Sequence, residues 1–490
     1  MPLKPAQKTG MPHEEVPQRA RTFDEVNRGY TESRARFEAL RCLQCQEPVC
    51  EEGCPVHVPI KSFIKCIADG KFEEAFGQVR NAHPLPAICG RVCPQESQCE
   101  KLCHMATRFE PVAIGHLERF IADWAREHRR GSVTAPAAPT GARPPSPEAS
   151  ERLRVAIVGA GPSGLTAAGE LARLGYRVTI FEALHAPGGV LRYGIPEFRL
   201  PKAVLDDEIG QLKAMGVDII CNVIIGKTIT IDQLFQEQGF QAVFIGTGAG
   251  LPRFLGIPGE NLNGVYSANE FLTRINLMRA YQFPKCDTPL KVGTRVAVVG
   301  AGNTAMDAAR SALRMGASEA RIVYRRSEEE MSARVEEYTH AKEENVIFQW
   351  LTNPVRVLGS PEGWVTGLEC QGQRLGPPDE SGRARPIPTE EPPSVIPVDT
   401  VVVAIGTRPN RLLTKEGGLA TTSWGGLIVK EASGETSRSG VFAGGDAVTG
   451  AATVILAAGA GLKAAAGIHA KLSARGNGAA EPRPPGGGAG

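Results

Sequence analysis

The stretch RVAIVGAGPSGLTAAGELARLGYRVTIFE, from Arg154 to Glu182, predicts a nucleotide-binding unit. A β-rich run meets a glycine turn, continues into a helix and returns as a second strand. In G-x-G-x-x-G the first glycine permits the turn, the second admits a pyrophosphate, and the third brings helix and strand together. A lone motif of this kind also fits an ordinary tight turn, but here an acid that can accept from a ribose 2′-OH follows in order. The residues of the motif are Gly159, Gly161, Gly164 and Glu182.

A second stretch, RVAVVGAGNTAMDAARSALRMGASEARIVYRR, begins at Arg295 and repeats this pattern. Its first two glycines are kept, and alanine takes the third position, which the motif allows. Where the first unit ends in an acid, this one ends in two arginines. Paired guanidinium groups suit a 2′-phosphate, so we expect NADP(H) rather than NAD(H), the alternative being a solvated basic turn. These residues are Gly300, Gly302, Ala305, Arg325 and Arg326.

Length and charge narrow the class of protein. A chain of 490 residues is long enough for several domains, and its net charge of +2 argues against a nucleic-acid or membrane partner. Hydrophobic runs are too short to cross a bilayer, and the polar start MPLKPAQKTGMPHEE has no signal-peptide core, so we expect a cytoplasmic protein. In that reducing compartment, the twelve cysteines should be metal ligands or free thiols.

Nine of the twelve cysteines lie between Cys42 and Cys103. Eight of them form two runs, C-x2-C-x4-C-x3-C-P and C-x3-C-P-x4-C-x3-C, which resemble ferredoxin-type iron–sulfur motifs. Two 4Fe-4S clusters need eight ligands, so one cysteine is spare. Cys66 lies inside the helical stretch IKSFIKCIADG and is interpreted as a packed apolar residue, which makes Cys89 the eighth ligand by counting alone. The two runs comprise Cys42, Cys45, Cys50 and Cys54, then Cys89, Cys93, Cys99 and Cys103.

A helix is expected to follow Pro111 in the sequence PVAIGHLERFIADWAREH. Ile114, Glu118 and Ile121 fall on one face of it, so a carboxylate lies on the apolar stripe. Burying a bare charge is costly, and the carboxylate therefore needs a partner. Either it pairs with a basic side chain at the edge of the stripe, or it binds a cluster iron.

The chain also resembles known protein families, and this resemblance extends the predictions above. Two nested units followed by GVFAGGDAV resemble the flavoprotein disulfide-reductase fold, although the CxxC of those reductases is absent. With the cysteine region included, the chain resembles the glutamate synthase small (β) subunit family. The same resemblance extends to the large subunit of NADH-dependent ferredoxin:NADP+ oxidoreductase (transhydrogenase) and the N-terminal half of dihydropyrimidine dehydrogenase. The passages that carry it are RCLQC, CGRVCPQ, EPVAIGHLERF, GGVLRYGIPEFRLPK and VFAGGDAVTGAA.

The resemblance implies an α/β fold with two nested Rossmann-type dinucleotide-binding domains, preceded by a mainly α-helical iron–sulfur domain. It places two 4Fe-4S clusters in residues 1–130, FAD in 151–290 and 409–473, and NADPH in 291–408. Composition predicts a Pro-, Ala-, Gly- and Ser-rich linker at 131–150 and a disordered tail at 474–490. One cluster would bind Cys42, Cys45, Cys50 and Cys103, and the other Cys54, Cys93, Cys99 and Glu118, which leaves Cys89 spare. Residues implied to line FAD are Gly189, Val190, Arg199, Gly445, Asp446 and Thr453; those implied to line NADPH are Gly302, Asn303, Thr304, Arg325, Arg326 and Gly406.

The expected reaction is hydride transfer from NADPH to the flavin, followed by single-electron transfer through the clusters to a partner. The leading hypothesis is a glutamate synthase small subunit, whose separate large subunit would form glutamate. The first alternative is the large subunit of an NADH-dependent ferredoxin:NADP+ oxidoreductase, of the electron-bifurcating kind or not, with a ferredoxin or flavoprotein partner. The second is a non-catalytic iron–sulfur docking subunit, which the intact nucleotide motifs argue against.

Overall fold

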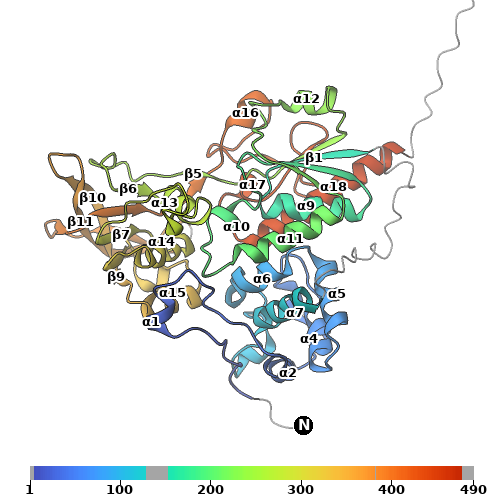
Figure 1. Cartoon of the computed structure of the whole chain (residues 1–490), viewed down its shortest axis with the longest axis horizontal. Coiled ribbons are helices and arrows are strands. Elements are labelled where there is room, and N and C mark those ends of the chain that lie inside the picture. The colour runs from blue at the N-terminus through green and yellow to red at the C-terminus, as the bar shows by residue number, and fades with distance from the viewer. Residues whose placement is uncertain (1–4, 129–152, 381, 477–490) are drawn as a thin grey trace, which may run out of the picture.

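The computed structural model describes residues 5–128, 153–380 and 382–476. Its N-terminal part is helical and lies beneath the first nucleotide unit in Figure 1. Its helices are α1 (Val16–Arg19), α2 (Glu32–Ala39), α3 (Val49–Glu52), α4 (Ile60–Ala68), α5 (Phe72–Ala82), α6 (Pro86–Val92) and α7 (Ile114–His128).

The first parallel sheet has the strand order β16-β4-β1-β2-β3. Its strands β1 and β4 are apolar and buried on both faces, as parallel strands between two layers are. Three helices, α9, α11 and α18, lie between this sheet and the helical part, and one apolar core joins the two. The bounds are β1 (Arg154–Val158), β2 (Arg177–Phe181), β3 (Asp218–Ile220), β4 (Ala242–Ile245), β16 (Val441–Ala443), α9 (Pro162–Arg173), α11 (Lys202–Ala214) and α18 (Val454–Gly476).

The second parallel sheet has the order β6-β14-β7-β8-β9 and is inserted between β4 and β16 of the first. Two nested units of this kind were predicted. The boundary at residue 291 differs, because β6 pairs with β14 and α13 packs into the core of the second sheet. The short strand β6 has no glycine turn to mark it in the sequence. The bounds are β6 (Val265–Ser267), β7 (Arg295–Val299), β8 (Glu319–Val323), β9 (Ile347–Gln349), β14 (Thr400–Val403), α13 (Ala268–Asn276), α14 (Asn303–Arg314) and α15 (Val335–Glu343).

Antiparallel strands complete the second unit. Strands β10 (Thr352–Gly359), β11 (Val365–Pro378), β12 (Ala384–Pro388) and β13 (Ser394–Ile396) form one sheet. Strands β5 (Leu251–Pro252) and β15 (Thr407–Arg408) pair where the chain enters and leaves this unit. The remaining short helices are α10 (Val190–Tyr193), α12 (Ile231–Gln236), α16 (Leu412–Glu416) and α17 (Asp446–Thr449).

Some local expectations differ from the structure. The stretch 21–41 reads as helical, yet only α2 forms within it, starting after the cap Thr31. The expected helix over 59–80 is divided into α4 and α5, because Gly70 adopts φ +77° and ends the first of them. The expected linker at 131–150 and tail from 477 lie outside the described residues, and α18 extends past the expected tail start at 474.

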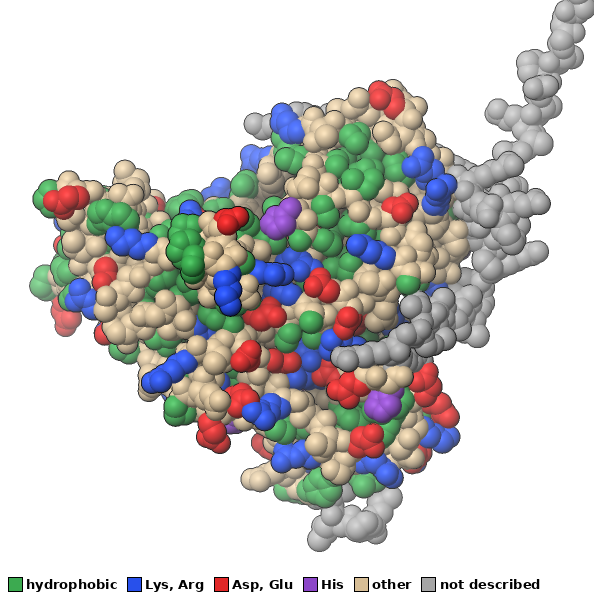
Figure 2. All heavy atoms as spheres, viewed as in Figure 1, with side chains coloured by type: hydrophobic (Ala, Val, Ile, Leu, Met, Phe, Trp, Pro, Cys, Tyr) green, Lys and Arg blue, Asp and Glu red, His purple; other side chains and the backbone are tan. Residues whose placement is uncertain are grey.

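Surface charge is mixed. Figure 2 shows acidic and basic side chains interspersed over the visible face, which agrees with the small net charge. Within the described ranges, no helix combines the length and apolar character that a bilayer crossing needs.

Candidate functional site

The first glycine turn forms a close-packed cradle. Gly159 has φ +102°, and a Cβ there would lie 2.6 Å from the carbonyl oxygen of Gly246. A Cβ at Gly164 would collide with the carbonyl oxygen of Gly159, so helix and strand meet as the motif requires. At Gly161 the space is open, since the nearest atom to a Cβ is 4.0 Å away. This cradle, at the N-terminus of α9, fits a pyrophosphate.

Glu182 lies beside this turn, at the end of β2. Its Oε2 accepts from the amide of Ala160 at 2.8 Å, and its Oε1 accepts from the amide of Leu184 at 2.9 Å. The side chain is buried, and each carboxylate oxygen keeps a second lone pair for a ribose hydroxyl. The structure thus brings the predicted acid and the predicted glycines together.

Two more predicted segments meet at the same place. Gly189 has φ +53°, and a Cβ there would lie 2.7 Å from the Cα of Gly161. Asp446 opens α17, and burial raises the pKa of its carboxyl group. Burial, then the charges of Asp446 and Glu182, raise the pKa of Tyr193 to about 12, so this phenol faces both acids. Of the other residues implied to line FAD, Val190 begins α10, Gly445 packs against Ser163, and Thr453 precedes α18.

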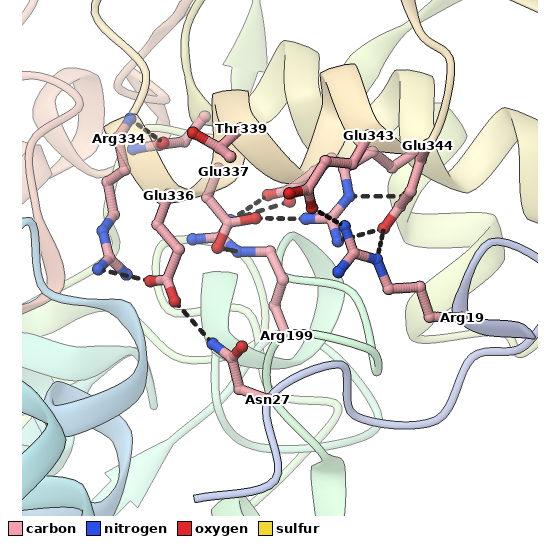
Figure 3. Close-up of polar contacts among 12 residues, drawn as sticks. Arg19, Asn27, Arg199, Arg334, Glu336, Glu337, Thr339, Glu343 and Glu344 are labelled. Carbon is pink, nitrogen blue, oxygen red and sulfur yellow. Dashed lines mark hydrogen bonds and ion pairs between the residues drawn. The ribbon is translucent and has the colours of Figure 1, made fainter. Parts of the chain in front are cut away.

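Arg199 is placed elsewhere. It was expected to line FAD, but its guanidinium donates to both oxygens of Asp307 at 2.9 and 2.7 Å. Its Nε lies 2.8 Å from Oε1 of Glu337. Because both acids belong to the second unit, the guanidinium is held between the two units (Figure 3).

The second glycine turn repeats the first. A Cβ at Gly300 would collide with the carbonyl oxygen of Ala404. Helix α14 begins directly after Gly302, so its first amides are available to a phosphate. The side chain of Asn303 accepts from the amide of Arg334 at 2.9 Å, while Thr304 is exposed. Gly406 lies just before β15, outside the turn.

The two arginines after β8 differ in environment. Arg325 is exposed. Arg326 is only 4 % exposed, forms an ion pair with Asp379 and donates through Nε to the carbonyl oxygen of Ala384 at 2.8 Å. Of the two guanidinium groups, the one at Arg325 therefore faces solvent, and the one at Arg326 holds the antiparallel strands in place.

The first set of thiols is Cys42, Cys45, Cys50 and Cys103. Burial raises the pKa of Cys50 to about 12, and the charges of the other three thiols raise it as well. Four sulfurs from two distant runs are thus close together. Four thiols are the number that a 4Fe-4S cluster takes, because each of its cysteines binds a different iron.

The second set of thiols is Cys54, Cys93 and Cys99, and all three are buried. Burial raises the pKa of Cys54 to about 11, and the nearby charges of Glu118 and Cys93 act in the same direction. Glu118 is thus next to this set, as the family resemblance implies. Its Oε1 is 3.1 Å from Nε2 of His83, a partner that the sequence did not indicate.

The two remaining cysteines of the region are buried. Cys89 is 1 % exposed, and the neighbouring side chain of Cys93, followed by burial, raises its pKa. Cys66 packs in the apolar core and accepts from Nε2 of Gln78 at 3.5 Å. The interpretation of Cys66 as a packed side chain agrees with this position.

A cluster of buried ion pairs around α15 was not predicted from the sequence. In the structure, Glu344 lies 2.8 Å from Arg310, 2.6 Å from Arg314 and 3.4 Å from Arg19 (Figure 3). Although burial opposes it, Arg310 lowers the pKa of Glu344 to about 2. Arg310 and Arg314, which lie four residues apart and therefore on one face of α14, are the signal in the sequence that could have revealed these pairs.

Comparison with known proteins agrees with this geometry. Residues 19–130 match the model of dihydropyrimidine dehydrogenase domain II, 4Fe-4S cluster, and residues 153–461 match that of pyridine nucleotide-disulphide oxidoreductase. The chain is 40% identical over 436 residues to the NADP(+)-dependent formate dehydrogenase subunit beta of Moorella thermoacetica, covering 86% of this chain and 60% of that one. It is 36% identical over 456 residues to the NADPH glutamate synthase small chain of Halomonas elongata, covering 92% and 93%.

Among solved structures, the FprA of Mycobacterium tuberculosis in complex with NADPH superposes with a TM-score of 0.56 at 21% identity, covering 66% of this chain and 85% of that one. That likeness supports the fold alone. The fold and the two glycine cradles define an FAD- and NADP-dependent oxidoreductase with an iron–sulfur domain. This chain belongs to the pyridine nucleotide-disulphide oxidoreductase family, in the group that contains the NADPH glutamate synthase small chains.

Proposed function

We propose that this chain is the NADPH-oxidising small subunit of a glutamate synthase, which delivers electrons to a large subunit that forms glutamate. The relative from Halomonas elongata, matched over nearly its whole length, supports this choice. When bound, NADPH supplies a hydride, FAD converts the electron pair into single electrons, and 4Fe-4S clusters carry those electrons one at a time.

The two glycine turns and the exposed Arg325 support this role. In the proposal, the turn at Gly159 and Gly161 receives the FAD pyrophosphate, and Glu182 receives a ribose hydroxyl of the same cofactor. The turn at Gly300 and Gly302 receives the pyrophosphate of NADPH. Arg325, the exposed guanidinium after β8, pairs with the 2′-phosphate.

One contact carries the proposal. A Cβ at Gly459 of α18 would lie 3.0 Å from the carbonyl oxygen of Pro55, the residue after Cys54. Helix α18 follows the Asp446 segment of the FAD unit, so the second set of thiols lies directly against that unit. We infer that the cluster on Cys54, Cys93, Cys99 and Glu118 is the one nearer the flavin.

Electrons would then leave the chain through the cluster on the first set of thiols. Its members Cys42, Cys50 and Cys103 are partly exposed, whereas the second set is buried. The neighbours Leu43 and Leu102 are 48% and 42% exposed. Apolar side chains beside a partly exposed redox site suit a protein partner, so we place the large subunit against this side.

One of the relatives carries a name other than glutamate synthase. The subunit from Moorella thermoacetica is 40% identical and belongs, by its name, to a formate dehydrogenase, and this chain spans 60% of it. The same electron-transfer unit therefore occurs in proteins named for other partners. The alternative for this chain is the large subunit of an NADH-dependent ferredoxin:NADP+ oxidoreductase.

Copurification of the partner proteins distinguishes the two proposed functions. The chain is isolated anaerobically from its native cell under its own promoter, and copurifying proteins are identified by mass. A large amidotransferase subunit that contains FMN is the expected partner. A ferredoxin-reducing flavoprotein with a 2Fe-2S subunit would replace the first proposal by the second.

A further inference from the structure

His83 is the partner of the buried carboxylate on α7. Its Nε2 lies 3.1 Å from Oε1 of Glu118, and the residue is 2 % exposed. The amide of Leu85 donates to Nδ1 of the same ring at 3.3 Å. Because Nδ1 accepts, the ring proton of a neutral imidazole is on Nε2, so His83 donates to Glu118.

The loop that carries His83 is anchored to the FAD unit. Arg80 donates to the carbonyl oxygen of Pro84 and lies 2.6 Å from Glu208 of α11. The side chain of Pro84 also packs on α9, where a Cβ at Gly169 would lie 3.3 Å from it. The direction of the imidazole is therefore set by two helices of the unit that holds the first glycine turn.

Glu118 and Cys89 are the two candidates for the fourth ligand of the cluster on the second set of thiols. The charge of Glu118 acts on Cys54, Cys99 and Cys89, so its carboxylate is near all of them. Cys89 lies four residues before Cys93 and is 1 % exposed, whereas Glu118 is held by Nε2 of His83 at 3.1 Å. We take Glu118 as the ligand, as the family resemblance implies, and the variants below test Cys89 in the same role.

We propose that His83 is a positioning residue that holds Oε1 of Glu118, so that Oε2 is the oxygen ligand of the cluster on the second set of thiols. The inference rests on the proposed function, because it requires that cluster. A hydrogen bond to a ligating carboxylate fixes its orientation and draws charge from it, and both effects alter the potential of the bound iron.

The test uses variants that separate the two ring nitrogens. In His83→Asn, the amide can still accept from Leu85 but is too short to reach Glu118. In His83→Gln, the longer side chain can donate at the place of Nε2. His116→Asn is the matched control, since His116 is half-buried on the same helical part but bonds to Tyr30 at 3.1 Å. Full-length protein is reduced with dithionite, and the EPR signals and midpoint potentials of both clusters are measured.

The expected result is that His83→Asn changes the EPR signal and the potential of one cluster only. His83→Gln restores them, and His116→Asn leaves them unchanged. If His83 acts through the carboxylate, His83→Asn has no further effect in a Glu118→Ala background. Signals of His83→Asn identical to wild type, or equal effects with and without Glu118, overturn the inference.

Two further outcomes are informative. If Cys89→Ala removes one cluster and Glu118→Ala leaves both signals intact, Cys89 is the ligand and the inference is wrong. Wild-type protein without iron and acid-labile sulfide would refute the proposed function itself. Wild-type protein with the iron of two clusters, together with an unaltered His83→Asn spectrum, would refute this inference alone.

Discussion

Arg199 of the first nucleotide unit and Asp307 of the second form a buried ion pair, with 2.7 Å between Nη1 and Oδ2. The same guanidinium contacts Glu337 on α15, and α15 in turn binds Arg19 of the N-terminal segment (Figure 3). One cluster of charges therefore joins three parts of the chain. We interpret it as the connection that sets how the NADPH unit sits against the FAD unit.

Replacing Arg199 tests this interpretation. Arg199→Ala leaves Asp307 buried beside an unfilled space, so we expect a loss of about 3–5 kcal/mol in the free energy of unfolding. Arg274→Ala removes an exposed pair with Glu270 and should cost only about 0.3–0.5 kcal/mol. Denaturant unfolding of holoenzyme measures both. Unchanged stability together with weaker FAD binding would instead return Arg199 to the flavin site.

Glu344 predicts an acid dependence of stability. Its pKa is about 2 in the folded chain against an ordinary 4.5, so its ion pairs stabilise the fold above pH 4.5. That stability, roughly 3 kcal/mol, is lost as the pH falls from about 4.5 toward 2. Glu344→Gln should be less stable at pH 6 and lose less over the same acid range. Parallel stability curves for the two proteins would contradict this assignment.

The two arginines after β8 predict separate effects. Arg325→Ala should raise the KM for NADPH about tenfold or more and leave the KM for NADH nearly unchanged, because only the 2′-phosphate contact is lost. Arg326→Ala breaks the buried pair with Asp379 and should lower stability without this selectivity. Steady-state kinetics with ferricyanide as acceptor compares them. Equal losses with both nucleotides in Arg325→Ala would refute the phosphate contact.

If each set of thiols holds one cluster, replacing a cysteine of either set should remove the iron of that cluster only. Cys50→Ser and Cys54→Ser should each remove or alter one cluster, so that each variant retains about half of the iron. Cys66→Ser, in the packed core of α4, should keep all of it. Iron and sulfide analysis of anaerobically purified protein provides the measurement. Full iron in Cys50→Ser and Cys54→Ser would mean that these thiols are not ligands.

How far the sequence predicts this structure depends on the distance between interacting residues. The glycine turns and the strands around them are encoded within about thirty residues, and the predicted βαβ units were confirmed. The stripe on α7 predicted that Glu118 needs a partner. His83, on another helix end, could not be identified without the packing of α5 against α7.

The features that the sequence did not predict depend on interactions between residues far apart along the chain. Arg199 and Arg326 look free in the sequence, because Asp307 and Asp379 lie far along the chain. Strand β6 precedes the expected start of the second unit at residue 291, and it joins the second sheet only through tertiary pairing with β14. Local patterns reveal glycine turns, whereas ion pairs between units depend on the complete fold.

The most direct test of the central claim is an anaerobic titration of the purified chain with NADPH, followed by absorption and EPR spectroscopy. We predict that the visible flavin absorption bleaches and that the signal of a reduced iron–sulfur cluster develops in the same titration. A chain that holds iron, acid-labile sulfide and flavin but leaves both spectra unchanged on addition of NADPH would contradict the account.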